Sequence, residues 1–469
     1  MVNLHGASIG ADLDCGDGQF IRKKTALEAE ESKISGSVWL SGKFKAAGMV
    51  ILTHSTIGGN LNCTEGQFIG QGDQPALFAV GANISGSVLL LKVQAQGGVS
   101  LSDATIGGNL DCTGGKFDDQ GKANAFALKV ERANINGSVW LGKDFLAKGP
   151  VTLYGASIGG DFECGDGRFN QDANNTSYLN AQFTKINGSV DLNDIKFIGR
   201  LDFQNSQIAN TFSWLGSSPT NAMLDLRLAK VGTLTDDTSS WPAPGQLFLQ
   251  GFVYDRIRSP SPVDAKNRIA WLDRQPTNVF LPQPYEQLTA VFRNMGLEDE
   301  AVAVIIAKNK GYAASLHWFP PGHWSECFWY KIFGRFVGYG YKTWRAFGLS
   351  LVFIGTGCLV FGFGRNRGLI LPTDEKDCGF DATGTPHVDQ NYPAFSDFIY
   401  SLEMFVPLVK LGMDDNWRPY ANRRTKIRIG RRRLEITGKV VRWYLWLHIL
   451  AGWALTTLWV GGLTGLVKT

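Results

Sequence analysis

The chain contains 469 residues, of which 56 are glycine, and its 46 Lys and Arg against 42 Asp and Glu give a net charge of 46 − 42 = +4. So small a net charge gives no indication of nucleic-acid binding, although basic residues crowd toward the C-terminus. The length predicts two or three domains rather than one.

Residues 2–214 contain a motif that recurs about nine times. One copy reads Ile57-Gly-Gly-Asn-Leu-Asn-Cys63, and the next reads Ile84-Ser-Gly-Ser-Val-Leu-Leu90. The leading isoleucines are 22 to 29 residues apart, with long and short steps alternating, and they are Ile9, Ile34, Ile57, Ile84, Ile106, Ile135, Ile158, Ile186 and Ile208. A period in this range is typical of a solenoid, because one repeat cannot bury its own apolar face.

Within each repeat, apolar residues recur at every second position, which predicts a strand with one buried face. A second short strand precedes it, for example at Val151 and Leu153. We therefore predict an all-β solenoid over residues 1–214, a right-handed parallel β-helix of about nine coils. With coils about 4.8 Å apart, this rod would be roughly 40 Å long.

The sequence begins within the repeat pattern, since Val2-Asn-Leu4 is in phase with Val151-Thr-Leu153 and no signal peptide precedes it. We expect either that upstream coils are missing or that the first coil presents an open edge, which favours self-association.

Four of the seven cysteines share one inward column of the repeats, and they are Cys15, Cys63, Cys112 and Cys164. Successive members lie two coils apart, about 10 Å, which is beyond the reach of a disulfide. We interpret them as small buried apolar residues. Unpaired cysteines also fit a reducing compartment.

An outward column alternates acidic or amide residues with large apolar ones, and it consists of Asp14, Trp39, Asn62, Leu89, Asp111, Trp140, Glu163 and Asp191. Four members form a candidate stripe for binding a protein or glycan partner, namely Trp39, Asp111, Trp140 and Glu163. The simpler interpretation, which we prefer, is that the tryptophans cover neighbouring loops and the acids are solvated. Calcium-binding Gly-Gly-x-Gly-x-Asp nonapeptides are absent from the sequence, and we expect no metal site.

Helical signals begin after residue 282. Residues 215–282 are predicted to be a cap and linker, because an exposed final coil needs covering. Residues 283–330 are predicted to be a helical hairpin and interfacial adaptor, with Tyr285, Leu288 and Phe292 on one helix face and Gly296 as the stop.

Residues 331–469 are predicted to be a membrane domain. Residues 346–364 and 443–467 carry no Asp, Glu, Lys or Arg, and both meet the length of about 20 residues needed to span a bilayer. Trp and Tyr residues before the first span suggest an interfacial belt.

A broken apolar segment, residues 395–412, lies between the two spans and contains candidate pore or gate residues, namely Asp397, Tyr400, Glu403 and Lys410. It would be a re-entrant pore helix in an oligomeric channel, or an amphipathic helix at the interface, which we prefer. No potassium-type filter sequence accompanies it.

Basic residues before the last span form a candidate cluster for anionic lipid, and they include Arg423, Arg424, Arg431, Arg432 and Arg433. They place that end in the cytoplasm, whereas the residues flanking the first span favour a cytoplasmic β-helix. The two expectations agree only if 395–412 crosses the membrane an odd number of times. Free cysteines and the absence of a signal peptide favour a cytoplasmic β-helix.

Enzyme chemistry finds little support, because no catalytic, nucleotide or cofactor motif appears and we expect no cofactor. The only clustered metal-binding residues, His317, His323 and Cys327, lack a fourth ligand.

Several motifs resemble a family of bacterial β-solenoid membrane proteins of unknown function, some labelled "membrane-associated oxidoreductase". They are the Ile-Gly-Gly-x-Leu-x-Cys repeats and the segments 283–288, 338–341, 400–402 and 452–457. The resemblance covers most of the chain and implies a bacterial inner-membrane location, but no catalytic residues.

These observations favour a membrane-tethered β-helix that acts as a binding scaffold or sensor and forms a homo-oligomer. The alternative is an oligomeric ion channel gated by the β-helix. A membrane-associated oxidoreductase is a third hypothesis, implied only by the resemblance.

Overall fold

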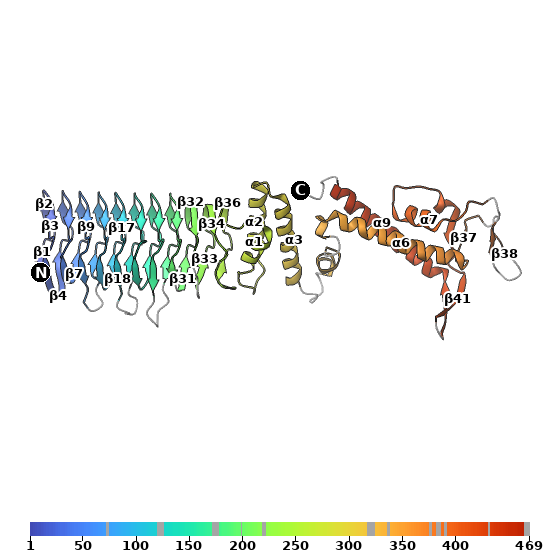
Figure 1. Ribbon diagram of the computed structural model, residues 1–469, viewed down its shortest axis with the longest axis horizontal. Helices are drawn as coiled ribbons and strands as arrows, with labels where there is room; N and C mark the ends of the chain where they lie inside the picture. Colours follow the sequence, from blue (N-terminus) through green and yellow to red (C-terminus); the bar gives the residue numbers. More distant parts are fainter. Residues whose placement is uncertain are drawn as a thin grey trace. The chain divides into compact units, whose positions relative to one another are not determined.

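The computed structural model describes residues 1–469 apart from 72–74, 120–125, 171–177, 198, 218–221, 317–323, 335–337, 375–377, 381–385, 389–391, 430–431 and 464–469. The chain divides into two compact units, Met1–Lys308 and Asn309–Thr469. The first contains the solenoid and the second contains the long apolar helices (Figure 1).

The first unit consists of two parallel β-sheets that run along a solenoid of about 10 turns. The 17-stranded sheet is made of β1 (Val2–Asn3), β4 (Gln19–Glu28), β7 (Lys45–Ile51), β10 (Gln67–Ile69), β11 (Leu77–Phe78), β14 (Gln94–Gln96), β15 (Val99–Ser100), β18 (Lys116–Asp118), β19 (Leu128–Lys129), β22 (Leu146–Lys148), β23 (Val151–Thr152), β26 (Arg168–Asn170), β27 (Tyr178–Asn180), β30 (Lys196–Phe197), β31 (Gly199–Asp202), β33 (Ala222–Asp225) and β35 (Leu247–Phe248).

The 19-stranded sheet is made of β2 (Ser8–Ile9), β3 (Leu13–Asp14), β5 (Lys33–Ile34), β6 (Val38–Trp39), β8 (Thr56–Ile57), β9 (Leu61–Asn62), β12 (Asn83–Ile84), β13 (Val88–Leu89), β16 (Thr105–Ile106), β17 (Leu110–Asp111), β20 (Asn134–Ile135), β21 (Val139–Trp140), β24 (Ser157–Ile158), β25 (Phe162–Glu163), β28 (Lys185–Ile186), β29 (Val190–Asp191), β32 (Gln207–Trp214), β34 (Lys230–Asp236) and β36 (Val253–Ile257). All pairings in both sheets are parallel, as predicted for a β-helix (Figure 1).

The repeated isoleucines stack in register, one above the next. Ile34 pairs with Ile57, Ile57 with Ile84, and Ile84 with Ile106, and all four are buried. Phenylalanines form a second internal stack in which neighbouring rings lie 5.3 to 5.5 Å apart, and it includes Phe20, Phe44 and Phe68. The predicted β-solenoid is therefore confirmed, with a core made of columns that run through successive coils.

Side chains of one coil pack into the space beside glycines of the next coil. Asn60 Oδ1 accepts a hydrogen bond from Ser87 N at 2.7 Å, and Ser87 Oγ accepts one from Asn109 N at 3.0 Å. A Cβ atom on Gly86 would lie 2.2 Å from Asn60 Oδ1. Each side chain thus occupies the space that a glycine leaves open in the adjacent coil.

The extra residues of the longer coils lie between β10 and β11, β18 and β19, and β26 and β27.

The solenoid continues beyond residue 214, where the sequence placed its end. Strands β33 to β36 extend the same two sheets to Ile257, since β34 pairs with β32 and β36 pairs with β34. Leu224 and Leu247 are buried in these added coils and are paired in register. The pattern escaped detection because the Gly-Gly motif is lost while the inward apolar positions remain.

Helices follow the final coil, namely α1 (Ala265–Leu272), α2 (Gln283–Asn294) and α3 (Glu298–Ser315). Gln283 Oε1 accepts a hydrogen bond from Gly251 N at 2.8 Å, and Gln287 Nε2 donates one to Tyr254 O at 2.7 Å. These amides satisfy backbone groups of the last coil that would otherwise lack a neighbouring strand. The predicted helices on either side of Gly296 are present as α2 and α3, with Gly296 at φ +77 between them.

The second unit is built around three mutually contacting helices, α6 (Thr343–Asn366), α7 (Asp397–Phe405) and α9 (Gly438–Leu463). The shorter helical segments are α4 (Trp324–Cys327), η1 (Phe328–Phe333), η2 (Gly338–Gly340) and α8 (Met413–Asn416). Three antiparallel strand pairs complete the described part, namely β37 (Ile370–Pro372) with β40 (Trp417–Pro419), β38 (Cys378–Phe380) with β39 (Pro386–Val388), and β41 (Arg424–Ile429) with β42 (Arg432–Thr437).

Among the described helices, α6 is the one that is long and apolar enough to cross a membrane, and it contains the predicted span 346–364. The predicted second span overlaps α9, which is helical but does not meet the same criterion within its described residues. The segment 395–412 forms α7 and then turns back, because β40 pairs with β37 directly after α6. The chain therefore returns to the end of the bundle at which α6 ends.

Candidate functional site

The outward column predicted from the sequence is a physical feature of the 19-stranded sheet. Asp111 pairs with Trp140, and Trp140 pairs with Glu163. Trp39 lies four coils before Trp140 in the same column, roughly 19 Å away at about 4.8 Å per coil. The four candidate stripe residues thus belong to one continuous line along the solenoid.

The short polar residues of this column shape the turns that follow the strands. Asp111 Oδ1 accepts a hydrogen bond from Thr113 N at 2.9 Å. Asp14, Asn62 and Asp191 accept equivalent bonds from the backbone N–H two residues ahead. This pattern is an Asx turn, in which the side chain replaces a backbone acceptor. Asp111 therefore has a structural role irrespective of any partner.

Glu163 and the two tryptophans differ from these turn residues. The indole of Trp140 hydrogen-bonds Glu163, and Trp39 Nε1 donates to Asp12 Oδ2 at 3.3 Å. Partial burial raises the pKa of Glu163, and the neighbouring Asp161 and Asp191 carboxylates raise it further. Both tryptophans are half-buried, so each presents one aromatic surface to solvent.

The four predicted pore or gate residues occupy different environments in the second unit. Asp397 is exposed at the start of α7, and Lys410 is exposed after its end. Tyr400 is buried against the rings of Phe361 and Phe395.

Glu403 is buried, and its carboxylate accepts hydrogen bonds of 2.7 to 2.9 Å from the backbone N–H groups of Leu411, Gly412 and Met413. It thereby holds the turn after α7 closed. In the single chain, these four side chains do not converge on one cavity among the described residues.

A polar contact between the three helices was not predicted from the sequence. Ser401 Oγ donates to Ile354 O at 2.8 Å and lies 3.3 Å from His448 Nε2. His448 is fully buried, and the rings of Phe361 and Phe405 pack against it. The signal in the sequence was His448 itself, an ionisable residue inside an apolar run.

A cavity of about 830 Å³ lies at the end of α6 where the chain leaves the helix. Within the described part of the chain, its lining brings together four arginines and one acid, namely Arg365, Arg367, Arg423, Arg424 and Asp397. The Arg365 guanidinium lies 4.5 Å from the centre of the Trp417 ring. Trp417 is buried, and its Nε1 donates to Pro393 O at 3.1 Å.

This cavity contains two of the five basic residues that the sequence assigned to lipid, Arg423 and Arg424. Residue Arg431 and the side chains of Arg432 and Arg433 lie outside the described part of the structure. From the sequence, Arg365 and Arg367 indicated only the orientation of the first predicted span in the membrane. Their spacing does not predict that they lie beside residues about 60 positions away.

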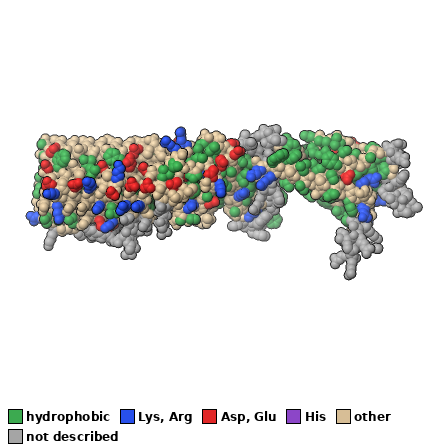
Figure 2. Space-filling model, in the orientation of Figure 1, with side chains coloured by type: hydrophobic (Ala, Val, Ile, Leu, Met, Phe, Trp, Pro, Cys, Tyr) green, Lys and Arg blue, Asp and Glu red, His purple; other side chains and the backbone are tan. Residues whose placement is uncertain are grey.

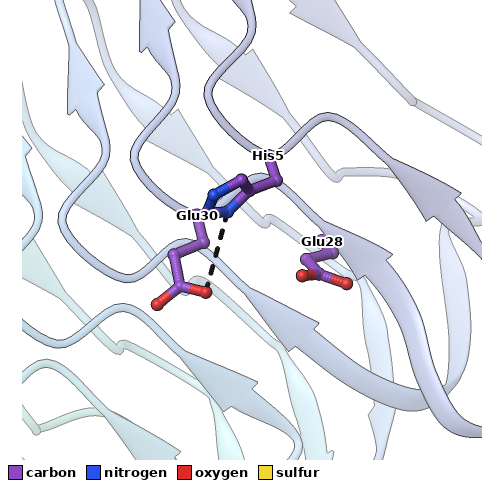
Figure 3. A group of neighbouring side chains, drawn as sticks. All are labelled: His5, Glu28 and Glu30. Carbon is purple, nitrogen blue, oxygen red and sulfur yellow. Dashed lines mark ion pairs between the residues drawn. The ribbon is translucent and has the colours of Figure 1, made fainter.

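One further group of potential metal ligands lies on the first coils of the solenoid (Figure 3). The ligand atoms of His5, Glu28 and Glu30 all lie within 4.8 Å of one another. His5 Nδ1 is 3.9 Å from Glu30 Oε2, and both side chains are solvent-accessible. The contact between His5 and Glu30 is an ion pair only when the imidazole is protonated.

Neither protein-family models, nor curated proteins, nor solved structures provide a match to this chain.

Proposed function

We propose that this protein is a β-solenoid scaffold anchored in a membrane by its second unit, and that it binds a partner along the outward column of the solenoid. The observation that carries the proposal is α6, an apolar helix of membrane-spanning length in the same chain as an uninterrupted parallel solenoid. On the resemblance described above, we place the protein in the inner membrane of a bacterium and expect it to form a homo-oligomer.

The surface of the helical bundle supports membrane anchoring. Leu359 on α6 is 74% exposed and Trp443 on α9 is 68% exposed. Figure 2 shows apolar side chains gathered over the helices of the second unit, whereas charged and polar side chains dominate the visible face of the solenoid. A contiguous apolar surface of this kind is typical of contact with lipid.

The solenoid supports partner binding through its regularity. Trp39, Trp140 and Glu163 project from strands whose neighbours are fixed by two ladders of hydrogen bonds, so their spacing is rigid. Rigid, half-buried aromatic side chains lose little entropy when a partner covers them. A protein or a glycan with a repeating surface would fit this line.

The test is capture of partners by purified full-length protein carrying Trp39→Asp and Trp140→Asp. We expect capture to be lost while thermal unfolding stays near that of the unmodified protein. The matched control carries Gln94→Asp, an exposed outward position on the 17-stranded sheet. Unchanged capture by the double variant would refute the stripe as the binding surface.

The side of the membrane on which the solenoid lies needs its own argument. Cys63, Cys112 and Cys164 are buried, and burial raises the pKa of each thiol. Buried thiols are inert, so they no longer favour a reducing compartment. Because 395–412 turns back, the arginines after α6 and those before α9 share one end of the bundle. The positive-inside rule favours a cytoplasmic position for that end, and the solenoid would then precede α6 on the opposite side, contrary to the expectation from sequence.

One observation supports the alternative function, an oligomeric ion channel. His448 and Glu403 are ionisable side chains buried among apolar helices, and such residues commonly belong to ion or proton pathways. We expect ion flux in liposomes that Glu403→Gln alters, and an assembly mass in nanodiscs of at least four chains. A monomer or dimer that shows no ion flux would refute the channel, and the scaffold would remain the proposed function.

A further inference from the structure

We propose that the cavity at the end of α6 binds the phosphate of an anionic phospholipid headgroup. The inference rests on the proposed membrane anchoring, and it adds a defined binding site to it. The cavity is formed entirely within the second unit, by residues at the end of α6, around the start of α7 and near the start of β41.

The charge of the lining selects an anion. Among the described lining residues, four arginines against one aspartate give 4 − 1 = +3. Guanidinium groups bind phosphate oxygens in pairs of parallel hydrogen bonds, a geometry that an ammonium group cannot reproduce. The four arginines come from two segments about 60 residues apart, and all four line the same cavity.

The cavity is partly organised before any ligand binds. Trp417 is held by its hydrogen bond to Pro393 O and by ring contacts with Tyr392 and Phe395. The Arg365 guanidinium lies over this fixed ring. The pairing of β37 with β40 places Trp417 beside the chain that leaves α6. Ordering of a binding group in advance lowers the entropic cost of binding.

The position of the cavity identifies a lipid as the source of the phosphate. Arg365 and Arg367 occupy the last turn of α6 and the residue beyond it, which is the level of the headgroups when α6 spans a bilayer. Exposed apolar side chains lie near this level on both α6 and α7, including Leu359 and Phe398. Acyl chains could therefore lie against apolar surface while the headgroup enters the basic cavity.

The size also agrees with a headgroup. A volume of about 830 Å³ falls within the range of about 300–1,000 Å³ that is usual for small-molecule sites. It is far larger than a single phosphate ion needs, and a glycerophosphate headgroup with its waters would occupy it better.

The experiment uses the full-length protein in nanodiscs of phosphatidylcholine, into which phosphatidylglycerol is titrated while bound lipid is counted by native mass spectrometry. Arg365→Gln with Arg423→Gln is the test variant. Lys342→Gln with Arg345→Gln is the matched control, because it removes two exposed charges at the opposite end of α6. At roughly fivefold for each basic residue, we expect about 25-fold weaker phosphatidylglycerol binding for the test variant alone.

Competition identifies the source of the phosphate. Inorganic phosphate at millimolar concentration should leave bound phosphatidylglycerol unchanged, and displacement by it would show a soluble-anion site instead. Equal lipid binding by the test and control variants would overturn the inference. Failure of the unmodified protein to stay in carbonate-washed membranes would instead refute the anchoring. Arg365→Lys with Arg423→Lys retains the charge, so it should fold and restore part of the affinity.

Discussion

Arg268 and Asp236 form a bidentate ion pair inside the first unit, with Arg268 Nη1 donating to Asp236 Oδ2 at 2.8 Å and Nη2 donating to Oδ1 at 2.6 Å. Both side chains are buried, and Trp241 Nε1 donates a further hydrogen bond to the same carboxylate at 2.8 Å. Asp236 ends β34 in the solenoid, whereas Arg268 lies on α1. The pair therefore fixes α1 to the last coils.

Removal of one partner should strongly destabilise the packing of α1 against the last coils. For Asp236→Asn we expect a loss of about 3–5 kcal/mol in the free energy of unfolding of the first unit, because Arg268 would remain buried with an uncompensated charge. Urea unfolding followed by circular dichroism measures the change. Glu65→Gln is the control, since its pair with Lys92 is mostly exposed and should contribute about 1 kcal/mol or less. Equal effects of the two substitutions would contradict the role of the buried pair.

The effect of a glycine-to-alanine substitution on stability should depend on whether the glycine faces a side chain of the adjacent coil. Gly86→Ala would place a Cβ 2.2 Å from Asn60 Oδ1 and 2.8 Å from Gly59 O, so the coils must move apart. We expect a loss of about 1–3 kcal/mol from this overpacking. In Gly10→Ala, the new Cβ meets nothing within 4 Å, and its melting temperature should stay unchanged. An unchanged melting temperature for Gly86→Ala would show that the space between adjacent coils tolerates a methyl group.

Asp264 should make the stability of α1 pH-dependent. Its carboxylate accepts a hydrogen bond from Asn267 N at 2.9 Å as the N-cap, and this bond and that from the Asn267 amide lower the pKa of Asp264. Because the folded pKa lies below the unfolded value of about 3.9, the stabilisation is present above that value and is lost as pH falls through the folded pKa. Asp264→Ala should cost about 1 kcal/mol at pH 7 and much less near pH 2. The difference between the two proteins in urea unfolding at both pH values measures this. A difference independent of pH would contradict the assignment of the cap to the ionised carboxylate.

The return of segment 395–412 predicts which residues face the same side of the membrane. Single cysteines at Asn366 and Lys439 should react with an impermeant maleimide from one side, and a cysteine at Lys342 should react from the other. All three native residues are exposed and lie at helix ends. Under the proposed anchoring, the positive-inside rule favours a cytoplasmic position for the first two. Labelling of Asn366→Cys and Lys439→Cys from opposite sides would show that the intervening segment crosses the bilayer.

The sequence by itself determined the features that repeat or that depend on nearest neighbours along the chain. The isoleucines from Ile9 to Ile208 revealed the coils because each coil makes the same contacts as the next, and repeated contacts leave a period in the sequence. Gly296 marked the end of α2 because a single residue with positive φ is enough to stop a helix. The length and composition of the apolar run 346–364 were enough to predict α6.

The tertiary structure decided the contacts that occur once and join distant segments. The pair between Arg268 and Asp236, the Ser401–His448 contact and the cavity between Arg365 and Arg423 have no period, so no spacing predicts them. The structure also distinguishes residues within the outward column. Asp111 accepts a hydrogen bond within its own turn, whereas Trp140 is half-exposed. Sequence shows which residues alternate along a strand, whereas partners are set by packing between segments far apart in the chain.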